Sequence, residues 1–328
     1  LSACRPDGMR RLLPLFRQDT SCISWQFAQC RRNFGLASVS TRALQPASGP
    51  VFLRHAGIFA SATVVGFGIS AATGSHVHLD LIGTGAFAIA ALAGGAQSMI
   101  SKAMMFLWSS RLATFLFYRA CLTGHDARLE DLLATTSGAA LFWGLSFVWN
   151  VVCSLPHTLA ISGAVRSSWC SLVCLPIGMG LFLLGWAIEC LADWQKWQFK
   201  KDLANKNKFC NVGLWSVSQH PNYFGNLALW LGIFVSNVPS LLEPVRSTSL
   251  LANLWSSRRL LISAASPAFL LALFYGQASG SITDTKKMQD ARYGADATYQ
   301  SYIKRVPLLF PDPSALAHEL GCFFGLHA

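Results

Sequence analysis

Long apolar stretches, separated by shorter polar segments, cover most of the chain after residue 55. Each is close to the ~20 residues that an α-helix needs to cross a bilayer. They lie at residues 56–74, 81–100, 103–122, 138–161, 169–191, 225–240 and 260–278. A helix satisfies its backbone hydrogen bonds internally, as a bilayer requires. The pattern therefore predicts an all-α fold, a multi-pass transmembrane helical bundle of about six to seven helices.

The composition supports a membrane protein. Of the 328 residues, 52% are hydrophobic and only 12% are charged, whereas soluble domains carry roughly 25% charged residues. The ten Cys residues are scattered, and none forms a Cys-x-x-Cys pair. We expect them to be small buried hydrophobic residues. The sequence therefore predicts neither a metal site nor a disulfide framework.

The charged loops are predicted to share one side of the membrane. Residues 119–137, 192–224 and 279–312 are separated from one another by pairs of predicted crossings. They carry most of the Lys and Arg residues that follow the first apolar stretch. The positive-inside rule places such loops on the cytosolic or matrix-like face.

The N-terminal arm, residues 1–55, is basic. Residues 1–57 hold eight Arg, no Lys and only two acidic residues, and Met9 is a candidate start. This composition is typical of an organellar transit segment, so a mitochondrial or plastid membrane is favoured over the endoplasmic reticulum. The alternative is a basic arm attracted to anionic membrane lipids. No nucleic-acid partner is expected, because the remaining positive charge is spread over the loops.

Two glycines and a polar strip stand out within the apolar stretches. Gly66-x-Gly68 predicts close helix packing in lipid, and no predicted strand precedes it, as a dinucleotide-binding loop would require. Glu189, Asp193, Lys196 and Lys200 share one face of a helix, because spacings of three and four residues return to the same side. This strip is interpreted either as a structural ion-pair cluster or as one edge of a polar cavity.

A further polar group opens the sixth apolar stretch. Pro221 suits the first turn of a helix, and His220, Asn222 and Tyr223 surround that turn. Backbone N–H groups at a helix start favour a phosphate or another anion. The alternative is a cap at the membrane interface, where Tyr is common.

Several motifs have the order and spacing of one known family. They are Asp193-x-Gln195-Lys196, Gly213-Leu214-Trp215, His220-Pro221-Asn222-Tyr223-x-Gly225, and a tail from Ala291-Arg292-Tyr293-Gly294 through Tyr299 and Tyr302 to Arg305-x-Pro307. With them the chain resembles the steroid 5-alpha-reductase C-terminal family, and more closely its subgroup described as a domain of unknown function, DUF1295. Trp108-x-x-Arg111-Leu112, Tyr118-Arg119 and Asp126-x-Arg128 are similar to that subgroup as well. The resemblance covers about residues 100–311.

The resemblance implies NADPH, held by the last helices and the charged loops, and hydride transfer to a conjugated carbon-carbon double bond in a lipid, sterol or steroid-like molecule. The chain would then consist of the arm, a membrane reductase-like domain at 56–312 and a C-terminal tail at 313–328. Tyr223 is the candidate catalytic group that polarises the substrate carbonyl. The predicted cofactor-binding residues are Lys196, Lys200, Trp215, His220, Asn222, Asn226 and Tyr299.

Two positions depart from the family pattern, and they keep other functions open. Gln219 stands where the family usually has Arg, and Asn226 where it has Glu or Asp. The first alternative is therefore a non-catalytic subunit of a membrane complex. The second is a membrane methyltransferase that uses S-adenosylmethionine, since such enzymes resemble this layout around a similar His-Pro segment.

Overall fold

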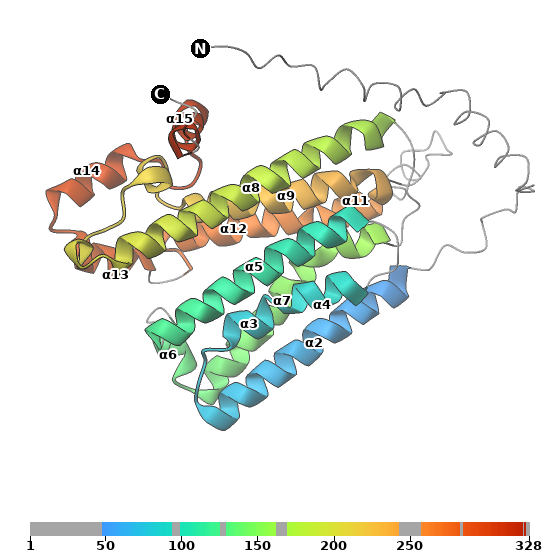
Figure 1. The fold of residues 1–328 in the computed structure, drawn as a ribbon. Helices are drawn as coiled ribbons and strands as arrows, with labels where there is room; N and C mark the ends of the chain where they lie inside the picture. The colour runs from blue at the N-terminus through green and yellow to red at the C-terminus, as the bar shows by residue number, and fades with distance from the viewer. Residues whose placement is uncertain are drawn as a thin grey trace, which may run out of the picture. The chain divides into compact units, whose positions relative to one another are not determined.

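The computed structural model describes residues 48–93, 99–124, 129–161, 169–242, 257–282, 285–323 and 325. All regular elements in these ranges are helices (Figure 1), which confirms the predicted all-α fold. Residues 1–47 of the predicted transit segment at 1–55, and the motif residues Asp126 and Arg128, lie outside the described residues. The interpretation of the N-terminal arm therefore stays a prediction.

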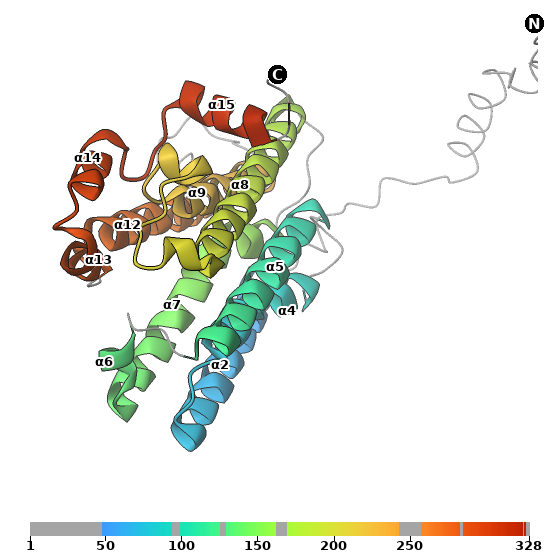
Figure 2. The same cartoon turned by 60° about the vertical axis from the view of Figure 1, so that its left-hand side comes forward.

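Two groups of long helices form the bundle. Figures 1 and 2 show α2, α5 and α7 in one group and α8, α9 and α12 in the other, with α13 and α14 at one end of the second group. The elements, in chain order, are α2 (Ser48–Thr73), α3 (Leu79–Gly83), α4 (Ala86–Ala93), α5 (Met99–Thr123), α6 (Glu130–Leu133), α7 (Thr136–Ile161), α8 (Trp169–Lys201), η2 (Leu203–Asn205), η3 (Gly213–Ser216), α9 (Pro221–Leu241), α11 (Arg258–Ser263), α12 (Ala265–Ser279), α13 (Thr285–Tyr293), α14 (Ala297–Arg305) and α15 (Pro313–Phe323).

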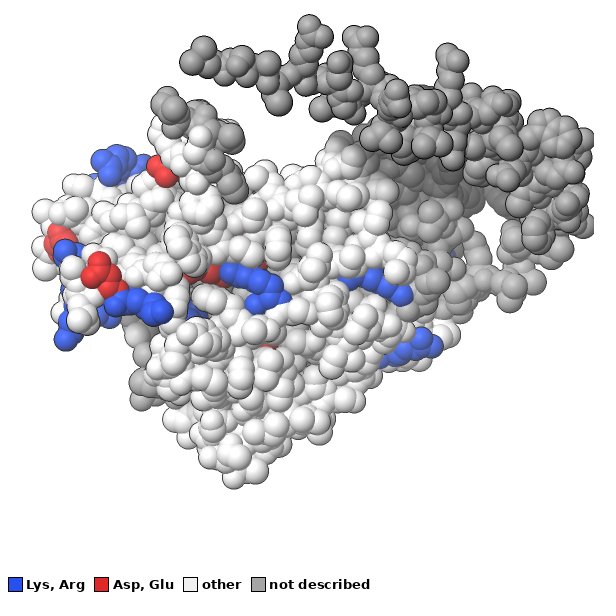
Figure 3. Space-filling view, viewed as in Figure 1, with Lys and Arg blue, Asp and Glu red and all other residues white. Residues whose placement is uncertain are grey.

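The long helices confirm an integral, multi-pass membrane protein. Five described segments are long and apolar enough to cross a bilayer: α2, α7, α8, α9 and the segment Arg258–Ser279. Large apolar side chains point outward along them, as with Val64 at 70% and Leu172 at 69% exposure, where lipid would cover them. On the face in Figure 3, charged side chains gather over α13 and α14, while most of the remaining surface is uncharged.

The predicted single helix over 81–100 is wrong. The described part of this stretch forms two short helices, α3 and α4, that break at Gly85. A Cβ at Gly85 would lie 2.1 Å from the carbonyl oxygen of Leu81, so the tight bend depends on glycine. Even as one helix, Leu79–Ala93 would span only about 22 Å.

Glycines bring α8 and α9 into backbone contact. Gly178 of α8 faces Gly232 of α9, and Gly185 faces Gly225. A Cβ on any of the four would lie 2.5–2.7 Å from a backbone N or O atom of the other helix. Small residues permit this close approach between membrane helices. The start of α9 is therefore held directly against the end of α8.

The two glycines predicted to pack closely in α2 differ in their surroundings. A Cβ at Gly66 would meet the Trp143 ring of α7 at 2.0–2.5 Å, which confirms close packing at that position. At Gly68 a Cβ would meet nothing within 4 Å, so the prediction is wrong there. The centre of the bundle is aromatic instead, where Phe87 packs on Trp108 and Trp230 at 5.3 and 5.5 Å between ring centroids.

The segment after α13 folds back over the start of α9. Tyr302 donates a hydrogen bond to the carbonyl of Trp215 at 2.7 Å, and Ser218 donates to that of Leu309 at 3.0 Å. The predicted C-terminal tail forms a helix, α15, whose Leu316 and Leu320 pack on the cluster around Trp215. The last helices thus cover one side of the loop between α8 and α9.

The α8–α9 contact predicts a stability difference between two glycines of one helix. Gly185→Ala should lower the free energy of unfolding by about 1–3 kcal/mol, because the methyl group overlaps the α9 backbone. Gly180→Ala is the matched control, since a Cβ there meets nothing within 4 Å. Thermal unfolding in detergent, followed by tryptophan fluorescence, compares the two, and equal midpoints would contradict the packing.

Candidate functional site

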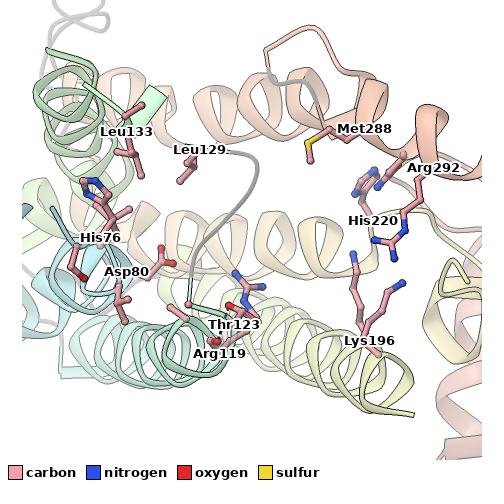
Figure 4. A pocket seen from close by; sticks show the side chains of 18 of the residues that line it. His76, Asp80, Arg119, Thr123, Leu129, Leu133, Lys196, His220, Met288 and Arg292 are labelled. Carbon is pink, nitrogen blue, oxygen red and sulfur yellow. Dashed lines mark hydrogen bonds between the residues drawn. The ribbon is translucent and has the colours of Figure 1, made fainter. Parts of the chain in front are cut away.

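A cavity of about 940 Å³ opens where the charged loops meet. Residues of all three loops predicted to share one membrane face contribute to its wall, including Arg119, Lys196 and Arg292. The ends of α2 and α7 complete the wall on the other side. Figure 4 shows the labelled side chains arranged around this space. The sidedness deduced from the sequence therefore agrees with the geometry.

The cavity wall is strongly basic. Four of its described residues are cationic, and only one, Asp80, is acidic; the cations are Arg119, Lys196, Lys200 and Arg292. They come from three different parts of the chain, which only the fold brings together. A concave, partly apolar wall with one sign of charge concentrates ligands of the opposite sign. The cavity thus favours an anionic ligand.

Aromatic rings lie beside these cations. The Lys196 Nζ lies 4.1 Å from the centroid of the Trp215 ring, whose Nε1 donates to the carbonyl of Ala192 at 2.9 Å. The Lys200 Nζ donates to the carbonyl of Lys208 at 2.6 Å and to the Tyr293 hydroxyl at 3.2 Å. These contacts hold flexible lysines in place at the wall, so less entropy is lost when they bind a ligand.

Five of the predicted site residues line this one cavity: Lys196, Lys200, Trp215, His220 and Tyr299. Of these, His220 carries no charge at neutral pH. Its burial, followed by the charges of Lys196 and Lys286, lowers its pKa to about 3. A neutral His220 can donate one hydrogen bond and accept another, but it does not pair with a phosphate as a cation.

The other three predicted residues do not line the cavity. The Tyr223 ring stacks on His220, at 5.0 Å between centroids, and on Phe274, at 4.7 Å. Asn222 and Asn226 lie one turn apart on α9, leading from the rim into the bundle. The catalytic role of Tyr223 stays a prediction, and the structure places it one layer behind the wall.

A buried polar cluster lies beside Asn226. Its Nδ2 donates to the Glu189 Oε1 at 2.8 Å, an arrangement that the α8–α9 contact permits. Arg111 of α5 pairs with Asp193 at 2.8 Å and with Glu189 at 4.0 Å. Both interpretations of the polar strip therefore hold: its acidic half forms ion pairs, and its Lys196–Lys200 half lines the cavity.

Three acceptor oxygens in this region accept no hydrogen bond within the described chain. They are the Asn222 Oδ1, the Asn226 Oδ1 and the Glu189 Oε2. Glu189 and Asn226 are 3% and 5% exposed. A buried acceptor without a donor costs about 1–3 kcal/mol. A bound group with N–H donors would remove that cost.

Gln219 has a structural role that the sequence did not indicate. Its Nε2 donates to the carbonyls of Ile303 and Val306 at 3.2 and 2.7 Å, and its backbone N–H donates to that of Pro307 at 2.9 Å. Gln195 also holds a loop in place, because its Oε1 accepts a hydrogen bond from the Leu214 N–H at 3.0 Å. Both motif residues fix loops around the cavity.

Sequence reasoning missed one side of the site. His76 lines the cavity from the segment between α2 and α3, and Asp80 lines it from the first turn of α3, both outside the region where the motifs were recognised. Asp80 is the first carboxylate after Asp19 in the sequence and directly precedes the apolar stretch at 81–100. An acidic residue at the border of a membrane segment is the signal that could have identified it.

Comparison with known proteins identifies a family and no individual relative. The model of a family described as "Protein of unknown function (DUF1295)" matches residues 66–306. No curated protein and no solved structure matches the chain. The match extends the resemblance seen in the motifs toward the N-terminus, so that α2 is partly included and the cavity residues His76 and Asp80 fall within it.

The ion-pair cluster predicts non-additive effects of mutation. Arg111→Met should destabilise the protein by about 3 kcal/mol, because it leaves two buried carboxylates without their cation. Adding Asp193→Asn should recover part of that loss, because the remaining repulsion between Asp193 and Glu189 disappears. Unfolding midpoints of both single variants and the double variant test this, and losses that simply add would refute the coupling.

Proposed function

The chain belongs to the family described as protein of unknown function (DUF1295), and we propose that it is a membrane-bound, NADPH-dependent oxidoreductase. Its substrate would be a lipid, sterol or steroid-like molecule with a conjugated carbon-carbon double bond. The observation that carries the proposal is the basic, aromatic-lined cavity between membrane helices. The resemblance of the motifs to steroid 5-alpha-reductases supports the same reaction class.

The charge and size of the cavity suit NADPH. Its phosphate groups require cations, and Lys196, Lys200, Arg119 and Arg292 supply them from separate elements. Tyr293 offers an aromatic face for the adenine ring, while Trp215, only 3% exposed, lies under Lys196. The volume of about 940 Å³ lies near the upper end of the roughly 300–1,000 Å³ of ligand pockets. S-adenosylmethionine carries a sulfonium cation and no phosphate, so this wall favours NADPH over it.

The buried acceptors suit the nicotinamide end of the cofactor. A carboxamide presents two N–H donors and one carbonyl acceptor. The Asn222 Oδ1, the Asn226 Oδ1 and the Glu189 Oε2 accept no hydrogen bond from described residues. Asn226 lacks the charge usual at its position, and its hydrogen bond to Glu189 brings a carboxylate to the same place.

When bound, NADPH would supply a hydride to the β-carbon of the double bond, and a proton would complete the reduction at the α-carbon. The protein's own residues bind and orient the cofactor and the substrate, and they polarise the substrate carbonyl. Tyr223 is our candidate for polarising the substrate carbonyl, since its ring stacks on the wall residue His220. His220 itself is neutral, so at that end of the cavity it offers hydrogen bonds while Lys196 supplies the positive charge.

Ligand titration tests this function. NADPH at a hundredfold excess over its Kd should stabilise the detergent-purified protein by about 2.7 kcal/mol in a thermal-shift assay, and S-adenosylmethionine should not. Lys196→Met should weaken NADPH binding about tenfold, because it removes one phosphate partner. Lys201→Met is the matched control, since Lys201 lies on the same helix but not on the wall. If neither ligand stabilises the protein in this assay, a non-catalytic membrane subunit is favoured instead.

The nicotinamide end has its own test. Asn222→Ala should weaken NADPH binding about tenfold, the effect of losing one hydrogen-bonded contact worth roughly 1–1.5 kcal/mol. ADP-ribose 2'-phosphate, which has the phosphates without the nicotinamide, should bind wild type and variant equally. Unchanged NADPH affinity in Asn222→Ala would overturn the assignment of this residue.

A further inference from the structure

The proposed reduction consumes a proton, and the described wall of the cavity holds three tyrosines that carry one: Tyr293, Tyr299 and Tyr302. The Tyr302 hydroxyl donates to the carbonyl of Trp215 at 2.7 Å, and the Tyr293 hydroxyl donates to that of Lys208 at 3.3 Å. A backbone carbonyl has no proton to return, so neither hydroxyl is resupplied through its acceptor. Tyr299 differs, because both of its hydrogen-bond partners are titratable side chains.

Tyr299 of α14 is hydrogen-bonded to a lysine and a carboxylate of α13. Its hydroxyl donates to the Asp290 Oδ1 at 3.3 Å and accepts from the Lys286 Nζ at 3.4 Å. Lys286 and Asp290 also pair with each other at 2.7 Å. The Lys286 Nζ lies 5.5 Å from the centroid of the Tyr299 ring. These side chains thus form one cluster, with the phenol at its buried end.

The cluster connects the cavity wall with solvent. Tyr299 is only 3% exposed, whereas the side chains of Lys286 and Asp290 are 29% and 47% exposed. Figures 1 and 2 show α13 and α14, which carry the cluster, at one end of the group formed by α8, α9 and α12. Lys286 therefore gives protons from the aqueous side a path to the hydroxyl through one hydrogen bond.

The surroundings of the cluster keep the hydroxyl protonated. Burial raises the pKa of Tyr299 above its ordinary value, although the charge of Lys286 acts in the opposite direction. Partial burial disfavours the charge of Lys286, but its contacts with Asp290 and Tyr299 outweigh this and raise the pKa of the lysine. Both groups therefore carry their protons at neutral pH, and the ammonium group is in place to stabilise a phenolate.

The same lysine places Tyr299 at the His220 end of the cavity. After burial and the charge of Lys196, the charge of Lys286 contributes to the low pKa of His220. Both Tyr299 and His220 line the cavity. Tyr223, the candidate group for polarising the substrate carbonyl, stacks on His220. The α-carbon of an enone is bonded to its carbonyl carbon, so this end of the cavity is where the proton is needed.

We propose that Tyr299 is the general acid of the reduction and that Lys286 resupplies its proton. This role rests on the proposed function, which assigns the hydride to NADPH. Hydride transfer to the β-carbon leaves an enolate, and the Tyr299 O–H bond breaks as its proton forms the new C–H bond at the α-carbon. The phenolate then takes a proton from the Lys286 ammonium group, which regains one from solvent. Each double bond thus consumes one hydride and one proton.

Removal of the hydroxyl tests this role. Tyr299→Phe should lower the rate of enone reduction about 100-fold or more, the contribution of a positioned general acid. Its NADPH affinity should stay within about twofold of wild type. The enones are a 2-alkenal, 2-cyclohexenone and 4-cholesten-3-one, and NADPH oxidation is followed by absorbance. Tyr275→Phe is the matched control, since Tyr275 is 57% exposed on α12 and lies outside the cavity wall.

Deuterium separates proton donation from a structural effect. In D2O the wild type should place deuterium on one face of the α-carbon of the reduced sterol, because the donor is fixed. Tyr299→Phe leaves protonation to water, so both faces should be labelled. Lys286→Met should slow reduction about tenfold and keep the label on one face. This variant changes a partly exposed side chain, so it tests the relay even if Tyr299→Phe does not fold.

The outcomes distinguish this role from the reductase itself. A Tyr299→Phe variant that reduces enones as fast as wild type, or a Lys286→Met variant that does so, would overturn the proton relay and leave the reductase standing. A Tyr299→Phe variant that binds NADPH about tenfold more weakly and keeps a single labelled face would make Tyr299 a cofactor contact, as the family resemblance implies, and would also overturn this role. A wild-type protein that reduces none of the three enones would overturn the proposed reductase, and the proton donor with it.

Discussion

The backbone contact between α8 and α9 is the constraint on which the site depends. Four glycines let the two helices approach until main-chain atoms meet. Lipid supplies little drive for helices to associate, so close van der Waals packing must provide it. Because α8 ends and α9 begins at the same side of the membrane, this contact brings Lys196 and His220 to one cavity and sets Asn226 against Glu189. If α8 and α9 lay farther apart, the two halves of the site would be separated.

The second constraint is the cost of polar groups inside the bundle. Arg111 lies on α5 with both of its carboxylate partners on α8, so the ion pairs also connect two helices. Buried charges are tolerated only when they are paired. The acceptor oxygens of Glu189 and Asn226 that accept no hydrogen bond from the described residues are therefore informative. They lie behind the cavity wall, on the facing sides of α8 and α9.

Much of the fold could be predicted because hydrophobic length determines it. The stretches at 138–161 and 169–191 became α7 and α8, since any apolar run near ~20 residues must be helical in lipid. Apolar length could not reveal the break at Gly85, which depends on a local main-chain contact. Nor could it distinguish Gly66, which packs on a tryptophan, from Gly68, where an added Cβ would meet no described atom within 4 Å, because the difference depends on how α2 is rotated.

Site residues that lie close together in the sequence could be predicted, and those that lie far apart in the sequence could not. Lys196 and Lys200 are one turn apart, so periodicity alone placed them on a common face, and both line the cavity. Arg292 and Asp80 reach the same cavity from opposite ends of the chain. No spacing rule connects positions that are separated by several membrane crossings.

The two departures from the family pattern are explained by the three-dimensional neighbours of each residue and not by its position in the sequence. Gln219 lacks a charge, but its amide holds the segment that ends α14, and the cavity wall already has four cations. Asn226 lacks a carboxylate, but Glu189 supplies one at hydrogen-bonding distance from the next helix. A second carboxylate at 226 would face Glu189 with like charge. The asparagine is therefore the side chain that this neighbour favours.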